Sequence, residues 1–250
     1  MKTRNYLHSV LNIMALAALS FMVAACSPET PEDENQHKLH EDPFKAVLTL
    51  QEGRLEGGVF NQNPEMKHFK ANTASPAQTI VWEVKSGKGW GVTSATNSFK
   101  VKNFEKNPDV VYYLNFEYFN QKGESMNHQF FDNGQDKIHQ HFFCVYRQID
   151  ANGVKKEVRE KKKANIPFDY NYADELNGTF IGNTNPMGFK GFFRFLKAGE
   201  KFTMNIELLH ATKTKLEKDG KPSPFYMPSA ENRSTGLWDI QIAVPIEIEK

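Results

Sequence analysis

The feature that most constrains the fold is a succession of short runs of β-forming residues separated by turn residues. The densest run covers residues 110–119 and consists mainly of valine, tyrosine and phenylalanine. Comparable runs lie at residues 46–50, 79–84, 179–182, 189–196, 202–209 and 237–248. Short runs of this kind with glycine, proline and asparagine between them are typical of antiparallel sheets. We therefore predict an all-β fold, mainly antiparallel, with little helix, arranged as a β-sandwich or barrel.

The composition agrees with that fold and limits the classes of partner. Of the 250 residues, 39% are hydrophobic and 24% are charged, which is ordinary for a globular protein. The formal net charge is +1, from 31 basic and 30 acidic residues, and this balance does not indicate a nucleic-acid-binding protein. Only one of the two cysteines, Cys144, lies in the β-rich region, so no intrachain disulfide framework is expected there.

The first 26 residues have the pattern of a targeting segment. Lys2 and Arg4 form a basic start, and the apolar run over residues 10–25 ends in Val23-Ala24-Ala25-Cys26. Small residues directly before a cysteine resemble the lipobox of bacterial lipoproteins. The resemblance implies a signal peptide over residues 1–25, diacylglyceryl transfer to Cys26, cleavage before this cysteine and N-acylation. The alternative is a secreted protein with an incidental cysteine.

Residues 26–43 are expected to form a disordered tether. Acidic residues and prolines dominate this stretch, and it has too few apolar residues to bury a core. Its acidic character is similar to the export tracts of Bacteroidota surface lipoproteins. The resemblance implies a lipid-anchored protein of the bacterial outer membrane, on its periplasmic or surface face. We interpret His37 and His40 in this tether as solvated.

Three histidines around a turn signal form the candidate site. Asn133-Gly134 separates two aromatic-rich runs, and this dipeptide favours a type I′ β-hairpin. With a two-residue turn, His128 lies opposite His139, and His141 follows on the same face. Glu124 belongs to that face as well. The sequence therefore predicts a transition-metal site made by these four side chains.

Two alternatives to this site stay open. A longer loop over residues 132–136 would move His128 to the opposite face of the hairpin, because a one-residue slip inverts every side chain. The second alternative is that His139 and His141 are partly exposed strand residues or hydrogen-bond partners in a wet seam. If the site does bind a ligand, we expect zinc, copper or iron, or a haem with axial histidines.

The His-x-His pair is also similar to the first cupin motif, in which a glycine precedes His-x-His on a barrel strand. Here the spacer between Gly134 and His139 is four residues rather than five, and no glutamate follows at the expected distance. We therefore infer no cupin activity.

Residues 154–163 concentrate positive charge. The basic side chains are Lys155, Lys156, Arg159, Lys161, Lys162 and Lys163. We interpret this segment as a solvated edge strand or loop, whose charges prevent edge-to-edge pairing. Contact with acidic lipid headgroups is the alternative.

The chain is thus divided into the signal peptide, the tether, a β domain or half over residues 44–150 that contains the histidine hairpin, and a second, similar β half over residues 151–250. No phosphate-binding loop, nucleophile elbow or Cys-x-x-Cys motif occurs, so we favour binding over catalysis. The expected function is that of a cell-envelope lipoprotein that binds a transition metal or metal-porphyrin and serves an outer-membrane transporter. The alternative is a structural, adhesive or glycan-binding surface lipoprotein without metal.

Overall fold

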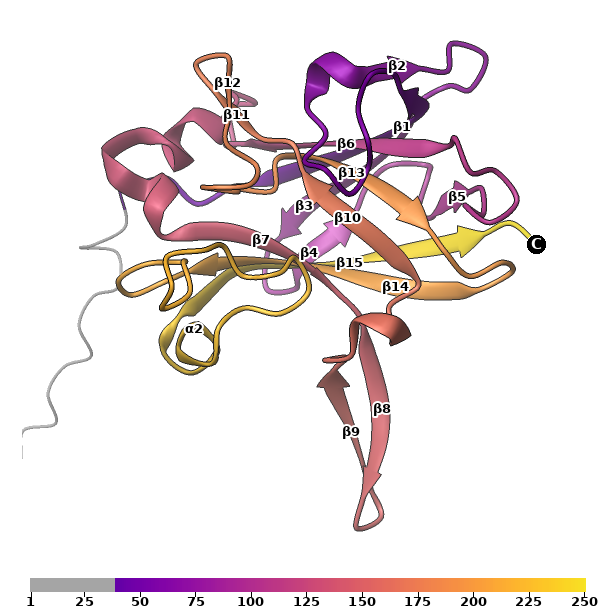
Figure 1. The fold of residues 1–250 in the computed structure, drawn as a ribbon. Coiled ribbons are helices and arrows are strands. Elements are labelled where there is room, and N and C mark those ends of the chain that lie inside the picture. Colours follow the sequence, from indigo (N-terminus) through magenta and orange to yellow (C-terminus); the bar gives the residue numbers. More distant parts are fainter. Residues whose placement is uncertain (1–38) are drawn as a thin grey trace, which may run out of the picture. The chain divides into compact units, whose positions relative to one another are not determined.

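The computed structural model describes residues 39–250, which form one compact unit. Antiparallel strands dominate it, and the longest α-helix of the described residues is α2 (Ala230–Thr235). Two sheets face each other across the main hydrophobic core (Figure 1). The prediction of an all-β, mainly antiparallel fold is confirmed.

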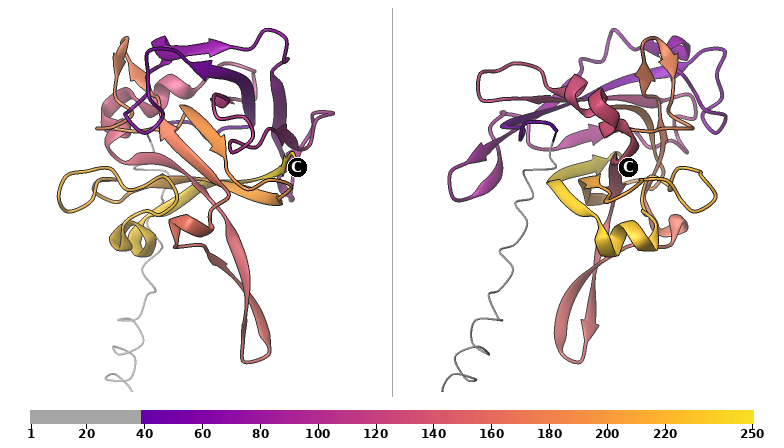
Figure 2. Two further views of the ribbon diagram at one scale, coloured as in Figure 1. Left: turned by 45° about the vertical axis from the view of Figure 1, so that its right-hand side comes forward. Right: turned by 90° about the vertical axis from the view of Figure 1, so that its left-hand side faces the viewer.

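The larger sheet contains seven strands in the order β10-β13-β6-β1-β3-β4, with β2 paired to β1. These strands are β1 (Lys45–Leu55), β2 (Phe69–Ala71), β3 (Gln78–Lys85), β4 (Gly89–Val92), β6 (Val111–Phe119), β10 (Phe168–Tyr172) and β13 (Lys190–Phe195). The sheet is strongly curled (Figure 2). Burial alternates along β1 and β6, so Leu48, Leu114 and Phe116 point into the core.

The smaller sheet has the order β5-β15-β14-β7. Its strands are β5 (Phe99–Val101), β7 (His139–Cys144), β14 (Lys201–His210) and β15 (Leu237–Ile248). Every residue of β7 is buried, because Phe143 belongs to the main core and Phe142 to a second cluster on the opposite face. This double coverage explains why the β7 sequence is apolar on both faces after its histidines.

The two segments that the sequence suggested as halves are interleaved. Strands β10 and β13, from residues 151–250, extend the sheet that contains β1, β3 and β6. Strand β14 pairs with β7 in the other sheet. Both large sheets are therefore built from both segments.

The remaining elements are short and lie outside these two sheets. They are η2 (Met66–His68), η3 (Asn127–Phe130), η4 (Asp132–Lys137), β8 (Tyr146–Ala151), β9 (Val154–Arg159), η5 (Lys163–Asn165), β11 (Glu175–Leu176) and β12 (Thr179–Phe180). Strands β8 and β9 pair only with each other and form an arm that projects from the body in every view (Figures 1 and 2).

The predicted hairpin centred on Asn133-Gly134 is wrong. Both residues have the positive φ angles, 53° and 78°, that this dipeptide favours. The turn nevertheless lies inside the 3-10 segment η4, and η3 replaces the expected first strand. Strand β7 pairs with β14 instead, so tertiary packing rather than the local turn determines its partner.

The signal peptide, Cys26, His37 and most of the predicted tether lie outside the described residues. Within residues 39–250, no helix is long and apolar enough to cross a membrane.

Candidate metal centre

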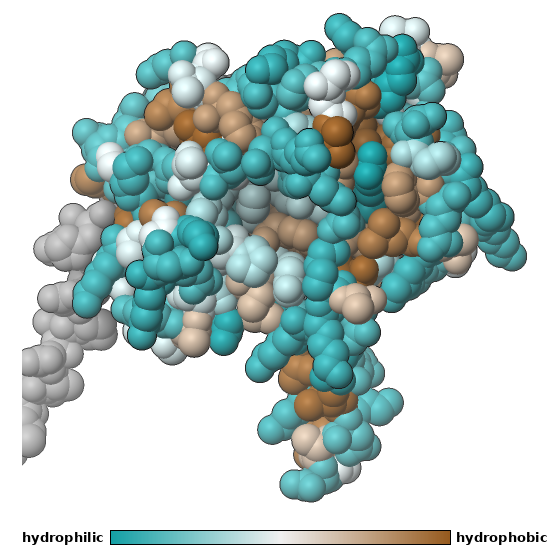
Figure 3. Space-filling model, viewed as in Figure 1, coloured by the Kyte–Doolittle hydropathy of each residue, from teal (hydrophilic) through white to brown (hydrophobic). Residues whose placement is uncertain are grey.

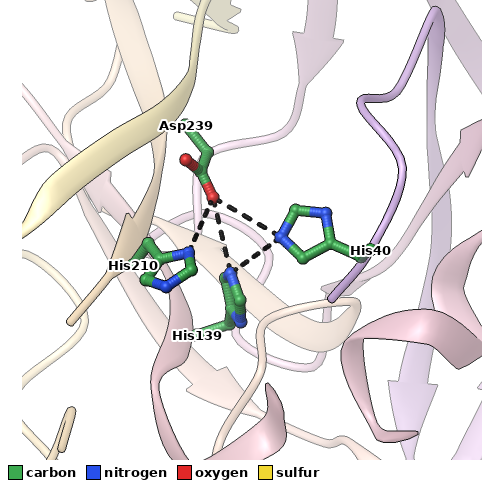
Figure 4. Close-up of side chains that lie close together, drawn as sticks. All are labelled: His40, His139, His210 and Asp239. Carbon is green, nitrogen blue, oxygen red and sulfur yellow. Dashed lines mark hydrogen bonds and ion pairs between the residues drawn. The ribbon is translucent and has the colours of Figure 1, made fainter. Parts of the chain in front are cut away.

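Four side chains from separate parts of the chain converge beside the smaller sheet (Figure 4). His139 is the first residue of β7 and His210 is the last residue of β14, and the two are direct partners in the antiparallel ladder. Asp239 comes from β15, and His40 comes from the segment before β1. Their nearest ligand atoms all lie within 4.8 Å of one another.

A β-bulge brings Asp239 into this group. The ladder between β14 and β15 pairs Leu208 with Ile240 but Leu209 with Trp238, so Asp239 has no partner residue in the register. The extra residue shifts the side-chain alternation at this point. Trp238 therefore packs on the outer cluster with Phe142, and Asp239 turns toward the histidines.

Four distances within the group lie close to those of a tetrahedral metal site. Oδ2 of Asp239 lies 3.4 Å from Nε2 of His139, 3.4 Å from Nδ1 of His210 and 3.7 Å from Nε2 of His40. The Nε2 atoms of His40 and His139 are 3.1 Å apart. Ligand atoms at bonds of about 2.0–2.2 Å from a tetrahedral zinc ion lie roughly 3.3–3.6 Å from each other. The four atoms lie within 4.8 Å of one another, so one ion can contact all of them once the more distant atoms move closer together.

The hydrogen bonds of two rings orient their Nε2 atoms toward the centre. Nδ1 of His139 donates to the main-chain oxygen of Gln135 at 2.9 Å, and Nδ1 of His40 donates to that of Glu41 at 2.9 Å. A carbonyl oxygen can only accept, so these contacts place the ring proton on Nδ1 and leave a lone pair on Nε2. This is the outer-shell arrangement found around metal-bound histidines.

Two neutral rings in these tautomers direct lone pairs at each other across 3.1 Å. A cation removes the repulsion, either as a proton on one ring or as a metal ion between them. Burial lowers the pKa of His139, although the hydrogen bond to Asp239 opposes that shift. A metal ion between the rings would bind all four groups at once.

The centre lies against apolar walls and opens on one side. The ring of His40 packs on Phe130 at 4.4 Å, and that of His139 meets Phe130 edge-on at 5.3 Å. The side chains of His40 and His139 are fully buried, whereas those of Asp239 and His210 are 10% and 15% exposed. An ion would enter past these last two groups.

Buried Lys215 fixes the main chain at His139. Its Nζ donates to the main-chain oxygens of His139 at 2.9 Å and Pro186 at 2.5 Å. Burial lowers the pKa of this lysine to about 7. The contact holds the start of β7 in place beneath the ligand-bearing side chain.

The structure brings together one of the four residues predicted from sequence. His139 belongs to the centre, whereas His128 and Glu124 are exposed residues outside it. Glu124 accepts a hydrogen bond from Asn120 instead.

His141 lies in the main core, two residues along β7 from His139. Its Nδ1 donates to the main-chain oxygen of Met187 at 2.7 Å, and its Nε2 accepts from the Tyr118 hydroxyl at 2.7 Å. Burial lowers its pKa to about 3, so the ring is neutral with both nitrogens satisfied. It acts as a hydrogen-bonded core residue rather than a ligand of this group.

Sequence reasoning missed His40, His210 and Asp239. The interpretation of His40 as a solvated tether residue is wrong, since this residue is only 6% exposed. His210 carried a signal, because it ends a β-forming run as His139 begins one. Asp239 carried no such signal, because regular alternation along β15 places it on the face opposite the histidines.

No family model, curated protein or solved structure matches this chain. The arrangement of His40, His139, His210 and Asp239 is therefore the basis for assigning a function.

Proposed function

We propose that this protein binds one transition-metal ion through His40, His139, His210 and Asp239. The observation that carries the proposal is the approach of two Nε2 atoms to 3.1 Å while both Nδ1 atoms donate to main-chain oxygens. Three imidazoles and one carboxylate suit zinc, copper or iron better than the oxygen-preferring calcium and magnesium. All four tetrahedral positions would be filled by protein, which favours binding over catalysis.

The geometry favours a bare ion over a metal-porphyrin. A haem occupies the four equatorial positions of its iron and leaves axial positions for protein ligands. Here the four protein atoms surround one point within 4.8 Å of one another. A porphyrin ring would have to separate them, whereas a single ion fits between them.

The proposal places the ion-binding protein in the cell envelope. The lipobox-like pattern at residues 1–26 supports lipid attachment at Cys26, and an outer-membrane transporter is the partner class that such an anchored metal-binding protein would serve. Metabolic labelling with a radioactive fatty acid tests the anchor. Label should enter the wild-type protein and be absent from Cys26→Ala, and a labelled Cys26→Ala protein would contradict lipidation at this residue.

Metal titration of the purified chain from Ser27 to Lys250 tests the binding site. This chain contains the whole compact unit over residues 39–250. We expect one zinc or copper ion per chain, measured by competition with a chromophoric chelator and by elemental analysis. The variants His40→Ala, His210→Ala and Asp239→Ala should each weaken binding at least about 100-fold, because removing even an outer-shell partner typically costs about 10–100-fold.

His128→Ala is the matched control, since this exposed histidine lies outside the centre. Its metal affinity should equal that of the wild-type protein. Loss of binding in His128→Ala, or unchanged binding in the three site variants, would reject the proposed ligand set. A wild-type chain that takes up no ion at micromolar concentration would reject the function.

A further inference from the structure

The projecting arm formed by β8 and β9 has two different faces. Its register pairs Arg147 with Val158, Ile149 with Lys156 and Ala151 with Val154, and directly paired residues lie on the same face. This face is therefore aliphatic and basic, with no acidic residue among those six, and the residues between them form the polar face. No other strand pairs with the arm, and Val154 on its aliphatic face is 56% exposed.

The base of the arm is firmly attached while its tip is free. Tyr146 and Arg159 both contact the carboxylate of Glu207 in β14, and the Arg159 guanidinium lies 5.2 Å from the ring centroid of Trp238. Figure 3 shows hydrophobic surface exposed along the arm, beyond this attachment. An isolated two-stranded ribbon is only marginally stable in water, so an aliphatic face held out in solvent indicates a surface that is covered in use.

Charge indicates what covers it. Residues 146–163 contain seven basic and three acidic side chains, a net charge of +4 in a chain whose total is +1. Lys156 lies on this face two residues beyond the exposed Val154 at the tip, whereas Lys155 lies on the polar face opposite Asp150. Lys161 and Lys162 are exposed just beyond the base. Aliphatic groups at the tip with lysines behind them match an interface of hydrocarbon and anionic headgroups, because the lysine side chain reaches the headgroup level.

We propose that the β8–β9 arm binds an anionic lipid surface through its aliphatic and basic face. A second copy of the chain fits this face less well, since Arg147 and Lys156 of two arms would repel each other. A protein partner usually contacts a central tryptophan, tyrosine or arginine in a well-packed pocket. This face has no aromatic residue, and its one arginine, Arg147, is already paired with Glu160 at 3.2 Å. The lysines along β9 also disfavour addition of another strand at its edge.

Vesicle flotation with the unlipidated chain from Ser27 to Lys250 tests the proposal. The probe is a vesicle of phosphatidylglycerol and phosphatidylcholine, compared with one of pure phosphatidylcholine. We expect binding to the anionic vesicle alone, and a decrease as salt is added. Lys156→Glu and the double variant Ile149→Ser, Val154→Ser should each bind at least about 10-fold more weakly.

Lys88→Glu is the matched control, because it makes the same charge change at an exposed position outside the arm. It should retain binding within about threefold of wild type. All variants should keep the wild-type unfolding temperature and one metal ion per chain, which separates this test from that of the metal centre.

Equal binding to neutral and anionic vesicles would overturn the proposal, as would arm variants that bind like wild type. Concentration-dependent dimerisation that the arm variants abolish, in the absence of vesicle binding, would also overturn it and assign the face to a second copy.

Discussion

Metal removal should release the segment that carries His40. This residue precedes β1, and its neighbour Glu41 is held by η3, since the Glu41 amide donates to Oε1 of Gln129 at 2.9 Å. Opening the segment withdraws one of four ligands from the ion. Metal binding and docking of the His40 segment are linked equilibria. The factor by which undocking weakens metal binding therefore equals the factor by which the bound metal favours the docked segment.

The size of the effect follows from this linkage. If withdrawing His40 weakens metal binding about 100-fold, a saturating ion stabilises the docked segment by about 2.7 kcal/mol. Hydrogen exchange of the Glu41 amide should then accelerate about 100-fold when a chelator removes the ion. The amide of Ile206, in the middle of β14, should change much less, because its ladder is independent of His40.

Hydrogen exchange measured by NMR or mass spectrometry, with and without chelator, checks this prediction. The His40→Ala variant should exchange fast at Glu41 in both conditions, and His128→Ala should behave like wild type. Equal protection of Glu41 with and without metal, in a protein shown to bind the ion, would refute the argument that His40 is a ligand.

Three further predictions concern single side chains. Asp239→Asn retains the shape but removes the charge, so metal affinity should fall at least about 10-fold in the chelator competition assay, and unchanged affinity would exclude the carboxylate as a ligand. Burial raises the pKa of Glu52, but hydrogen bonds from Lys102 and Asn72 outweigh it and hold the pKa below the ordinary 4.5. The folded state therefore binds fewer protons at Glu52 than the unfolded state does. The resulting contribution to stability is present above about pH 4.5 and is lost as pH falls through the folded pKa. Urea titrations of Glu52→Gln should show a smaller loss of stability at low pH, and a pH profile identical to that of the wild type would contradict this prediction. Burial raises the pKa of Cys144, so a thiol reagent should modify it only after unfolding, and rapid modification of the native protein would show that the site is open.

The sequence predicted the fold class because the pattern of strands is repeated along the chain. Runs such as residues 110–119 and 237–248 became strands β6 and β15, with their apolar residues in the core. The pairing of these strands did not follow from the sequence, because it depends on contacts between distant segments. Strand β6 lies between β1 and β13, and β7 pairs with β14 rather than with a neighbouring run.

Of the four residues in the candidate site, only His139 was predicted from the sequence. The Asn133-Gly134 turn adopts the backbone angles that its residues favour, yet it joins 3-10 turns instead of two strands, which leaves His128 on the surface. Asp239 reaches the centre because of a β-bulge. A bulge breaks the period-2 alternation from which the facing of strand residues is predicted, so the sequence placed Asp239 on the wrong face. His40 is polar and lies in an acidic stretch, so its composition indicated solvent while its packing on Phe130 buries it.

Crystallographic anomalous scattering at the absorption edge of the bound metal tests the central claim most directly. The account predicts one anomalous peak per chain, about 2.0–2.2 Å from Nε2 of His40 and His139, Nδ1 of His210 and a carboxylate oxygen of Asp239. A metal-soaked crystal without a peak between these four side chains, or with its peak at His128, would contradict it.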